Sequence, residues 1–211
     1  MNGFFNGRVF PGGLSPFAFL SGGALLVVAS DRLAHALTVL VALVWVYCLS
    51  SLAAFGGARF FPARGRPVLF AFLASFAAAM YLLLLWILFP LGALQVFFAV
   101  SFIPVLCAGS GICRRLEGKG LAQALSLSVA EALVAGALLV LVSLVREPLG
   151  FRSLSLPGGA QGIMLFHPFG AESPLYLRLL SGSAGALLLL GYLLGIYRHF
   201  RAKRPDGGDG P

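Results

Sequence analysis

Residues 67–113 read PVLFAFLASFAAAMYLLLLWILFPLGALQVFFAVSFIPVLCAGSGIC and contain no Asp, Glu, Lys or Arg. An α-helix crosses the hydrocarbon core of a bilayer in about 20 residues. These 47 uncharged residues are therefore long enough for two crossings. We expect a pair of membrane-spanning helices over 67–90 and 91–112.

Further apolar stretches lie on both sides of this pair. Residues 9–30, 33–58 and 179–197 contain no Asp, Glu, Lys or Arg, and 121–145 contains only Glu131. The whole pattern predicts an all-α polytopic membrane protein with six transmembrane helices, over residues 14–30, 35–58, 67–90, 91–112, 121–145 and 175–198. A single transmembrane domain then occupies residues 14–198, between an N-terminal segment (1–13) and a basic, Gly-rich tail (199–211).

The composition excludes other classes of protein. Hydrophobic residues make up 59% of the 211 and charged residues 10%, whereas a soluble domain averages about 25% charged residues. Disordered chains need low hydrophobicity, and three cysteines in or beside apolar runs do not form a disulfide framework.

The basic residues predict the orientation in the membrane. Six spans place both chain ends and the second and fourth connections on one side, and these segments hold most of the 15 Lys and Arg residues. Short loops rich in Lys and Arg stay in the cytoplasm. We therefore expect both termini in the cytoplasm, and we attribute the net charge of +8 to topology instead of nucleic-acid binding.

The two halves of the chain align without a gap when shifted by 88 positions. Leu-Ala-His-Ala-Leu at 33–37 falls on Leu-Ala-Gln-Ala-Leu at 121–125, and Pro16 falls on Pro104. The duplicated unit holds three spans, so its second copy enters the membrane from the opposite face. The alignment predicts an inverted 3+3 repeat with halves at about 14–90 and 91–198.

Two clusters of small residues correspond under the same shift. They are Ser21, Gly22 and Gly23 in the first span and Gly109, Ser110 and Gly111 in the fourth. Inverted-repeat folds often place their functional site at the membrane midplane, where interrupted helices meet. We expect the first and fourth helices to be broken there. Plain packing contacts between small residues are the alternative.

Three segments resemble the integral subunits shared by the Rnf and Nqr electron-transport complexes. They are Arg-Pro-Val-Leu-Phe at 66–70, Ser-Phe-Ile-Pro at 101–104 and Val-Arg-Glu-Pro-Leu-Gly-Phe at 145–151. The last resembles the Arg-Glu-x-x-Gly signature that ends the family's fifth helix. The resemblance covers about residues 14–197 and implies a six-span subunit in the cell inner membrane, paired with a related six-span subunit.

The resemblance also implies an intramembrane [2Fe–2S] cluster, with one cysteine from each broken helix of the two subunits. In this chain the corresponding positions are Ser110 and one of the three residues 21–23, and neither is a cysteine. Cys107 and Cys113 flank Ser110 but point about 60° away from its direction on a helix. We therefore expect no iron–sulfur cluster and no other cofactor bound by this chain.

Glu131 is the acidic residue well inside a predicted span. An ionisable group there is by default a functional hypothesis, so it is a candidate ion or proton site, with Gln95 and Ser128 as candidate polar neighbours. The alternative is a glutamate that holds helices together. His35 begins the second span and corresponds to Gln123 in the repeat, which favours a polar role at a helix end.

Arg146 and Glu147 lie where the fifth span is expected to end, before Pro148. An adjacent charged pair at a membrane interface predicts a salt bridge or a contact between subunits, so we assign them an assembly role.

These features lead to one main hypothesis, a membrane-embedded subunit of an Rnf/Nqr-like, ion-translocating electron-transport complex. Such a chain is at most a non-catalytic subunit of the translocase. A secondary transporter that uses the clusters at 21–23 and 109–111 together with Glu131, and a purely structural paralogue, are the alternatives.

Overall fold

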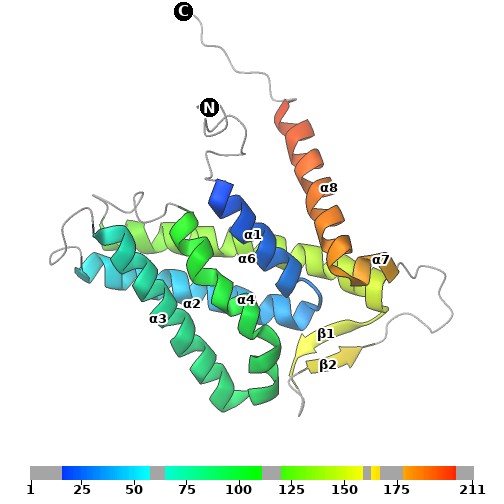
Figure 1. Cartoon of the computed structure of the whole chain (residues 1–211), viewed down its shortest axis with the longest axis horizontal. Helices are drawn as coiled ribbons and strands as arrows, with labels where there is room; N and C mark the ends of the chain where they lie inside the picture. The colour runs from blue at the N-terminus through cyan, green and yellow to red at the C-terminus, as the bar shows by residue number, and fades with distance from the viewer. Residues whose placement is uncertain (1–15, 58–64, 111–119, 159–162, 167–177, 203–211) are drawn as a thin grey trace, which may run out of the picture.

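The computed structural model describes residues 16–57, 65–110, 120–158, 163–166 and 178–202. In chain order these form α1 (Pro16–Ala29), α2 (Leu33–Gly57), α3 (Arg66–Leu88), α4 (Pro90–Gly109), α6 (Leu121–Phe151), β1 (Leu154–Pro157), β2 (Ile163–Phe166), α7 (Arg178–Ser181) and α8 (Ser183–Ala202). Figure 1 shows a helical bundle with a small β-hairpin beside the end of α6.

Four of the described helices, α2, α3, α4 and α6, are each long and apolar enough to cross a membrane. This agrees with the predicted class of membrane protein. Helix α1 has 14 described residues, and the apolar part of α8 is Ser183–Leu193. Both are shorter than the roughly 20 residues of a complete crossing, so six spans remain a prediction.

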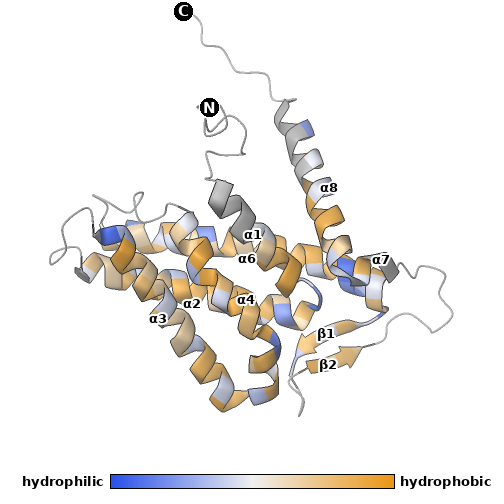
Figure 2. Cartoon of the chain, in the orientation of Figure 1, coloured by the Kyte–Doolittle hydropathy of each residue, from blue (hydrophilic) through white to orange (hydrophobic). Residues whose placement is uncertain are grey.

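Many large apolar side chains of this bundle face outward, although Phe70, Leu43 and Ile103 are buried in the core. On α3 the buried positions include Ala74, Ala77 and Ala78, whereas Phe72 and Phe76 are exposed. Figure 2 shows that α3 and α4 consist mostly of hydrophobic residues. Small residues let membrane helices approach closely, and bulky apolar residues suit contact with lipid.

Helix α2 is packed against α3, α4 and α6. It runs antiparallel to α6, because Leu33 at its start meets Glu147 near the end of α6, while Leu40 meets Gly136 further back. A Cβ atom on Gly136 would lie 2.7 Å from Cγ of Leu40. The α2–α6 contact therefore depends on a residue without a side chain.

The structure differs from the predicted spans at two places in the second half of the chain. The predicted fifth span of 121–145 is a helix of 31 residues that continues through Pro148 to Phe151, where Arg152 ends it in a left-handed conformation (φ 57°). The connection between the predicted fifth and sixth spans contains β1 and β2, which pair antiparallel with Leu154 opposite Phe166. The fold is thus predominantly helical, as predicted, with one added β-hairpin.

The prediction of a broken first helix is wrong. Helix α1 is continuous through Ser21, Gly22 and Gly23. A Cβ on Gly22 would lie 3.6 Å from Leu106 of α4, and one on Gly23 would lie 3.7 Å from Leu190 of α8. The glycines therefore allow close packing between helices, which offsets their low helix propensity.

The fourth helix is not interrupted within its described length either. Helix α4 continues through Pro104 and ends at Gly109, and the Ser110 N–H donates to the Leu106 carbonyl. Gly111 lies outside the described residues.

Candidate functional site

Arg146 lies near the C-terminal end of α6 and is only 2% exposed. Its guanidinium makes five hydrogen bonds, as many as it has N–H groups. The acceptors are the carbonyl oxygens of Val27, Leu180, Ser181 and Gly182 and the hydroxyl oxygen of Ser30, at 2.8–3.4 Å. One buried cation thus joins the end of α1, the end of α6 and the α7–α8 connection.

The position of Arg146 matches the electrostatics of the helices that it contacts. The last carbonyl groups of a helix have no intrahelical partner and carry partial negative charge, which attracts cations. Val27 belongs to the last turn of α1, and Leu180 and Ser181 end α7. The desolvation cost of the guanidinium is offset by these carbonyl groups.

Glu147 provides the opposite arrangement at the start of α2. Its side chain is fully buried, and Oε2 accepts a hydrogen bond of 2.7 Å from the Leu33 N–H. The next amide, that of Ala34, donates to the hydroxyl oxygen of Ser155 on β1 at 3.1 Å. A carboxylate is stabilised at a helix N-terminus by free N–H groups and by the helix dipole.

Glu147 also carries an unused acceptor. Its Oε1 atom is buried and has no hydrogen-bond partner in the part of the chain that the structure describes. We name Ser30, Arg146, Glu147 and Ser155, with the helix ends that they bind, the helix-end cluster.

A second chain of polar contacts begins in the α1–α2 turn. Asp31 Oδ1 accepts a 2.8 Å hydrogen bond from the Arg32 N–H and lies 2.8 Å from His35 Nδ1. The other ring nitrogen of His35, Nε2, lies 3.1 Å from Gln95 Oε1 on α4. This chain connects the first half of the sequence to the second.

Asp31 is held in its charged form by this environment. Burial raises the pKa of its carboxyl group, but the hydrogen bond and charge of His35, the Arg32 N–H and the charge of Arg146 together bring the pKa below its ordinary value of 3.8. Asp31 is therefore an anion at neutral pH.

A small pocket opens beside His35. Its volume is about 150 Å³, and it lies between the first turns of α2, the α3–α4 turn and the hairpin. Apolar walls come from Leu85, Phe89, Val96, Pro157 and Ile163, and the polar side chains are His35, Thr38 and Gln95.

Arg146 and Glu147 form no salt bridge with each other in the described residues, whereas their role in subunit assembly stays a prediction. Both side chains are buried, and within the described residues they bind other segments instead of each other. Neighbouring residues point about 100° apart on a helix, so the two reach different partners. Their role in this chain is to join its own helices.

Glu131 lies apart from the helix-end cluster, half-buried in α6 and 15 residues before Arg146. The helical rise puts about 22 Å between these positions. Of its expected neighbours, Ser128 donates to the Ala124 carbonyl, and Gln95 contacts His35. Glu131 as an ion or proton site therefore remains a prediction.

The predicted midplane residues come only partly together. Helices α1 and α4 are neighbours through Gly22 and Leu106, and the Ser110 hydroxyl donates to the Cys107 carbonyl at the end of α4. Ser21 belongs to α1, but its side chain and Gly111 lie outside the described part of the structure. In that part, no three His, Cys, Asp or Glu side chains gather as metal ligands would.

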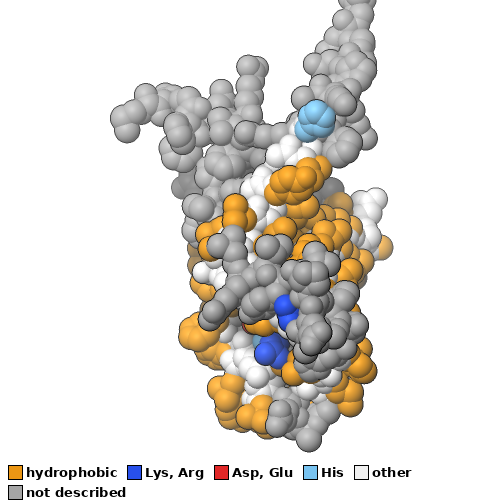
Figure 3. All heavy atoms as spheres, turned by 90° about the vertical axis from the view of Figure 1, so that its right-hand side faces the viewer, with side chains coloured by type: hydrophobic (Ala, Val, Ile, Leu, Met, Phe, Trp, Pro, Cys, Tyr) orange, Lys and Arg blue, Asp and Glu red, His pale blue; other side chains and the backbone are white. Residues whose placement is uncertain are grey.

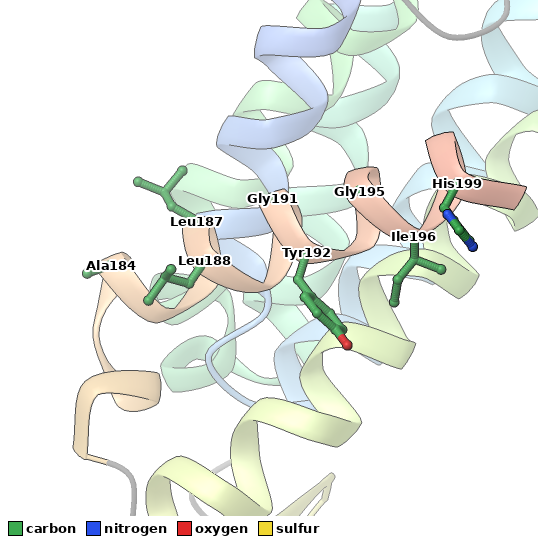
Figure 4. A pocket seen from close by; sticks show the side chains of 8 residues that line it. All are labelled: Ala184, Leu187, Leu188, Gly191, Tyr192, Gly195, Ile196 and His199. Carbon is green, nitrogen blue, oxygen red and sulfur yellow. The ribbon is translucent and has the colours of Figure 1, made fainter. Parts of the chain in front are cut away.

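Helix α8 presents an open apolar face. Ala184, Leu187, Leu188, Gly191, Tyr192, Gly195, Ile196 and His199 line it (Figure 4). A Cβ on Gly191 or Gly195 would have no atom within 4 Å, and Tyr192 is 71% exposed. Figure 3 shows hydrophobic side chains over much of the described surface on this side of the molecule.

Sequence reasoning missed Asp31, Gln95 and Ser155 as members of these two polar systems. Ser-Asp before an apolar run is a signal for the start of a helix, so the Asp31 contact was detectable. The link from Ser155 to Ala34 spans 121 residues and depends on a hairpin that was not predicted.

No protein-family model matches the chain, and no curated protein matches its sequence. The four long apolar helices indicate a helical membrane protein.

Proposed function

We propose that this chain is a membrane-embedded subunit of an Rnf/Nqr-like ion-translocating electron-transport complex, located in the inner membrane with both termini in the cytoplasm. It contributes helices beside a related six-span subunit and binds no iron–sulfur cluster of its own. The redox cofactors belong to its partners, so the chain itself is not catalytic.

The observation that carries this proposal is the use of the Arg-Glu-x-x-Gly residues. Arg146 binds the ends of α1 and α7, Glu147 caps α2, and a Cβ on Gly150 would lie 2.9 Å from the Ser181 nitrogen. All three residues that resemble the family's signature thus serve one junction. A chain whose signature residues hold its own helices together fits the role of a scaffold subunit in this family.

The helix arrangement supports an inverted repeat. The shift of 88 positions places the start of α1 on the end of α4 (residues 104–109) and α2 on residues 121–145 of α6. Helix α1 lies beside α4, and α2 lies beside α6 (Figure 1). The open face of α8, with Gly191 and Gly195, is the surface we assign to the partner subunit, because small residues permit close helix contact.

Gentle solubilisation and identification of co-purifying chains test the proposal. We expect a related multi-span membrane protein to be recovered with this chain, and we expect no stoichiometric iron on this chain once separated from its partners. Recovery of the chain alone, as a monomer or homodimer, would contradict the complex and favour a transporter.

The variant Glu131→Gln tests the predicted role of Glu131 in ion transport. Unchanged ion flux in this variant would remove Glu131 from the transport path.

A further inference from the structure

The contacts of His35 indicate which of its ring nitrogens are protonated. Both ring nitrogens lie within hydrogen-bond distance of an oxygen atom, 2.8 Å for Nδ1 to Asp31 and 3.1 Å for Nε2 to Gln95. An ionised carboxylate and an amide oxygen are acceptors only. In this arrangement both nitrogens of His35 must donate, so the ring is an imidazolium.

Gln95 permits a second arrangement. Rotating its carboxamide by about 180° exchanges Oε1 and Nε2, which have nearly the same shape. The amide group of Gln95 then donates to an unprotonated Nε2 of His35, while Nδ1–H continues to donate to Asp31. Neutral and charged His35 are therefore both satisfied without movement of the backbone.

We propose that Asp31, His35 and Gln95 form a proton-binding site, in which His35 takes up a proton at Nε2 and Gln95 reverses its carboxamide in response. Asp31 is the fixed anion that balances the imidazolium. Uptake forms one N–H bond and breaks none in the protein.

Protonation of His35 changes whether the adjacent pocket presents hydrogen-bond donors or an acceptor to a small molecule. Gln95 lines this pocket together with His35. When His35 is charged, the oxygen of Gln95 is engaged and its N–H groups remain available, so the pocket presents hydrogen-bond donors. When His35 is neutral, the amide oxygen becomes available instead, and the pocket presents an acceptor.

Few titratable or charged groups of the described structure lie near His35. Asp31 and Arg32 face it from the α1–α2 turn, and Glu147 and Arg146 lie behind that turn on α6. From α3, Tyr81 donates to the Thr38 carbonyl. The described pocket residues of α4 and the hairpin are Gly92, Gln95, Val96, Pro157, Gly158 and Ile163, none of which is ionisable.

Nitrogen-15 NMR of the full chain, labelled at histidine and at the glutamine side chain and held in lipid nanodiscs, tests the proposal. We expect His35 to pass from two protonated ring nitrogens to one between about pH 5 and about pH 8. The side-chain amide signal of Gln95 should change with the same midpoint. The signals are assigned with His35→Gln and Gln95→Leu.

Two variants and a control separate this site from an ordinary histidine. Asp31→Asn and Gln95→Leu should each move the His35 midpoint by about half a pH unit or more, whereas Gln123→Leu, the matched exposed residue on α6, should leave it unchanged. Gln95 is exposed, so its variant is not expected to prevent folding. A His35 ring that keeps one neutral form throughout this range, or a Gln95 signal that does not follow it, would overturn the proposal.

Discussion

Arg146 shows why an arginine is needed where three chain segments meet. Its five hydrogen bonds point in the fixed directions of a planar guanidinium. Lysine offers three donors on a compact ammonium group and cannot reach all of these acceptors. The charge alone is therefore insufficient at this position.

We expect Arg146→Lys to lower the free energy of unfolding by about 1–2 kcal/mol, because at least two hydrogen bonds are lost. Arg146→Met should cost about 3 kcal/mol or more, since it leaves four partly buried carbonyl groups without this hydrogen-bond donor. Unfolding in mixed detergent micelles measures both. Leu144→Ala, at an exposed position on the same helix, is the control, and equal stability of Arg146→Met and this control would refute the role of the guanidinium.

Glu147 can be tested by separating its hydrogen bond from its charge. Glu147→Gln keeps an oxygen acceptor for the Leu33 N–H and should cost less than about 1 kcal/mol. Glu147→Ala leaves that N–H buried and unpaired, which costs about 1–3 kcal/mol. Hydrogen exchange at the Leu33 amide reports the contact directly, and we expect faster exchange in the alanine variant alone. Equal exchange rates of the Leu33 amide in both variants would contradict the capping role of Glu147.

Asp31 predicts a dependence of stability on pH. Its pKa in the folded chain is below the ordinary value of 3.8, so the unfolded chain binds a proton more readily. The stabilisation is then complete above about pH 5 and is lost as the pH falls through the folded pKa. We expect the stability difference between the wild type and Asp31→Asn to shrink below about pH 4. A difference that stays constant down to pH 3 would contradict this linkage.

At the scale of elements, two glycines set how closely helices approach. A Cβ on Gly136 would lie 2.7 Å from Leu40 Cγ, and one on Gly150 would lie 2.9 Å from the Ser181 nitrogen. We expect Gly136→Ala and Gly150→Ala each to destabilise the fold by about 1–3 kcal/mol through overpacking. Thermal unfolding in detergent measures the effect.

Gly56 in α2 is the matched control, because a Cβ there meets no atom within 4 Å. Alanine has the higher helix propensity, so Gly56→Ala should leave stability unchanged or raise it. A loss at Gly56 as large as at Gly136 would show that close contact with a neighbouring helix does not explain the effect at Gly136.

Apolar runs predicted most helix positions in this chain. The boundary between α3 and α4 was expected at residues 90 and 91 and lies at Phe89, because a proline favours the first turn of a helix. The extension of α6 was missed because Pro148 was taken as a stop. Tertiary contacts of Arg146 and Glu147 hold the following turn in place despite the missing N–H group of the proline.

The residues of the helix-end cluster were only partly predictable. Arg146 and Glu147 stood out because they are charged residues beside an apolar run. Their burial depends on α7 and the hairpin, which hydropathy does not reveal. The break expected at Gly22 failed for a related reason, since side chains from α4 and α8 pack against the glycines.

At the scale of the whole molecule, the helix-end cluster and the pocket lie at one end of α2 and α6. If α6 crosses the membrane, Gly120 before it and Met164 in the hairpin after it lie on opposite sides. In a chain without other reactive cysteines, we expect Gly120→Cys to react with an impermeant thiol reagent from the cytoplasm and Met164→Cys from the other side. Reaction of both from one side would show that α6 does not span.

The turn at Phe89 has a consequence for how this protein is made. One residue separates α3 from α4, and residues 67–113 contain no charge. An isolated arginine or aspartate at the centre of a membrane helix costs about 2.5–3.5 kcal/mol during insertion. The pair of helices α3 and α4 contains no such residue between residues 67 and 109. The two helices can leave the ribosome and partition into lipid as one unit, before the charged residues of the helix-end cluster have been synthesised.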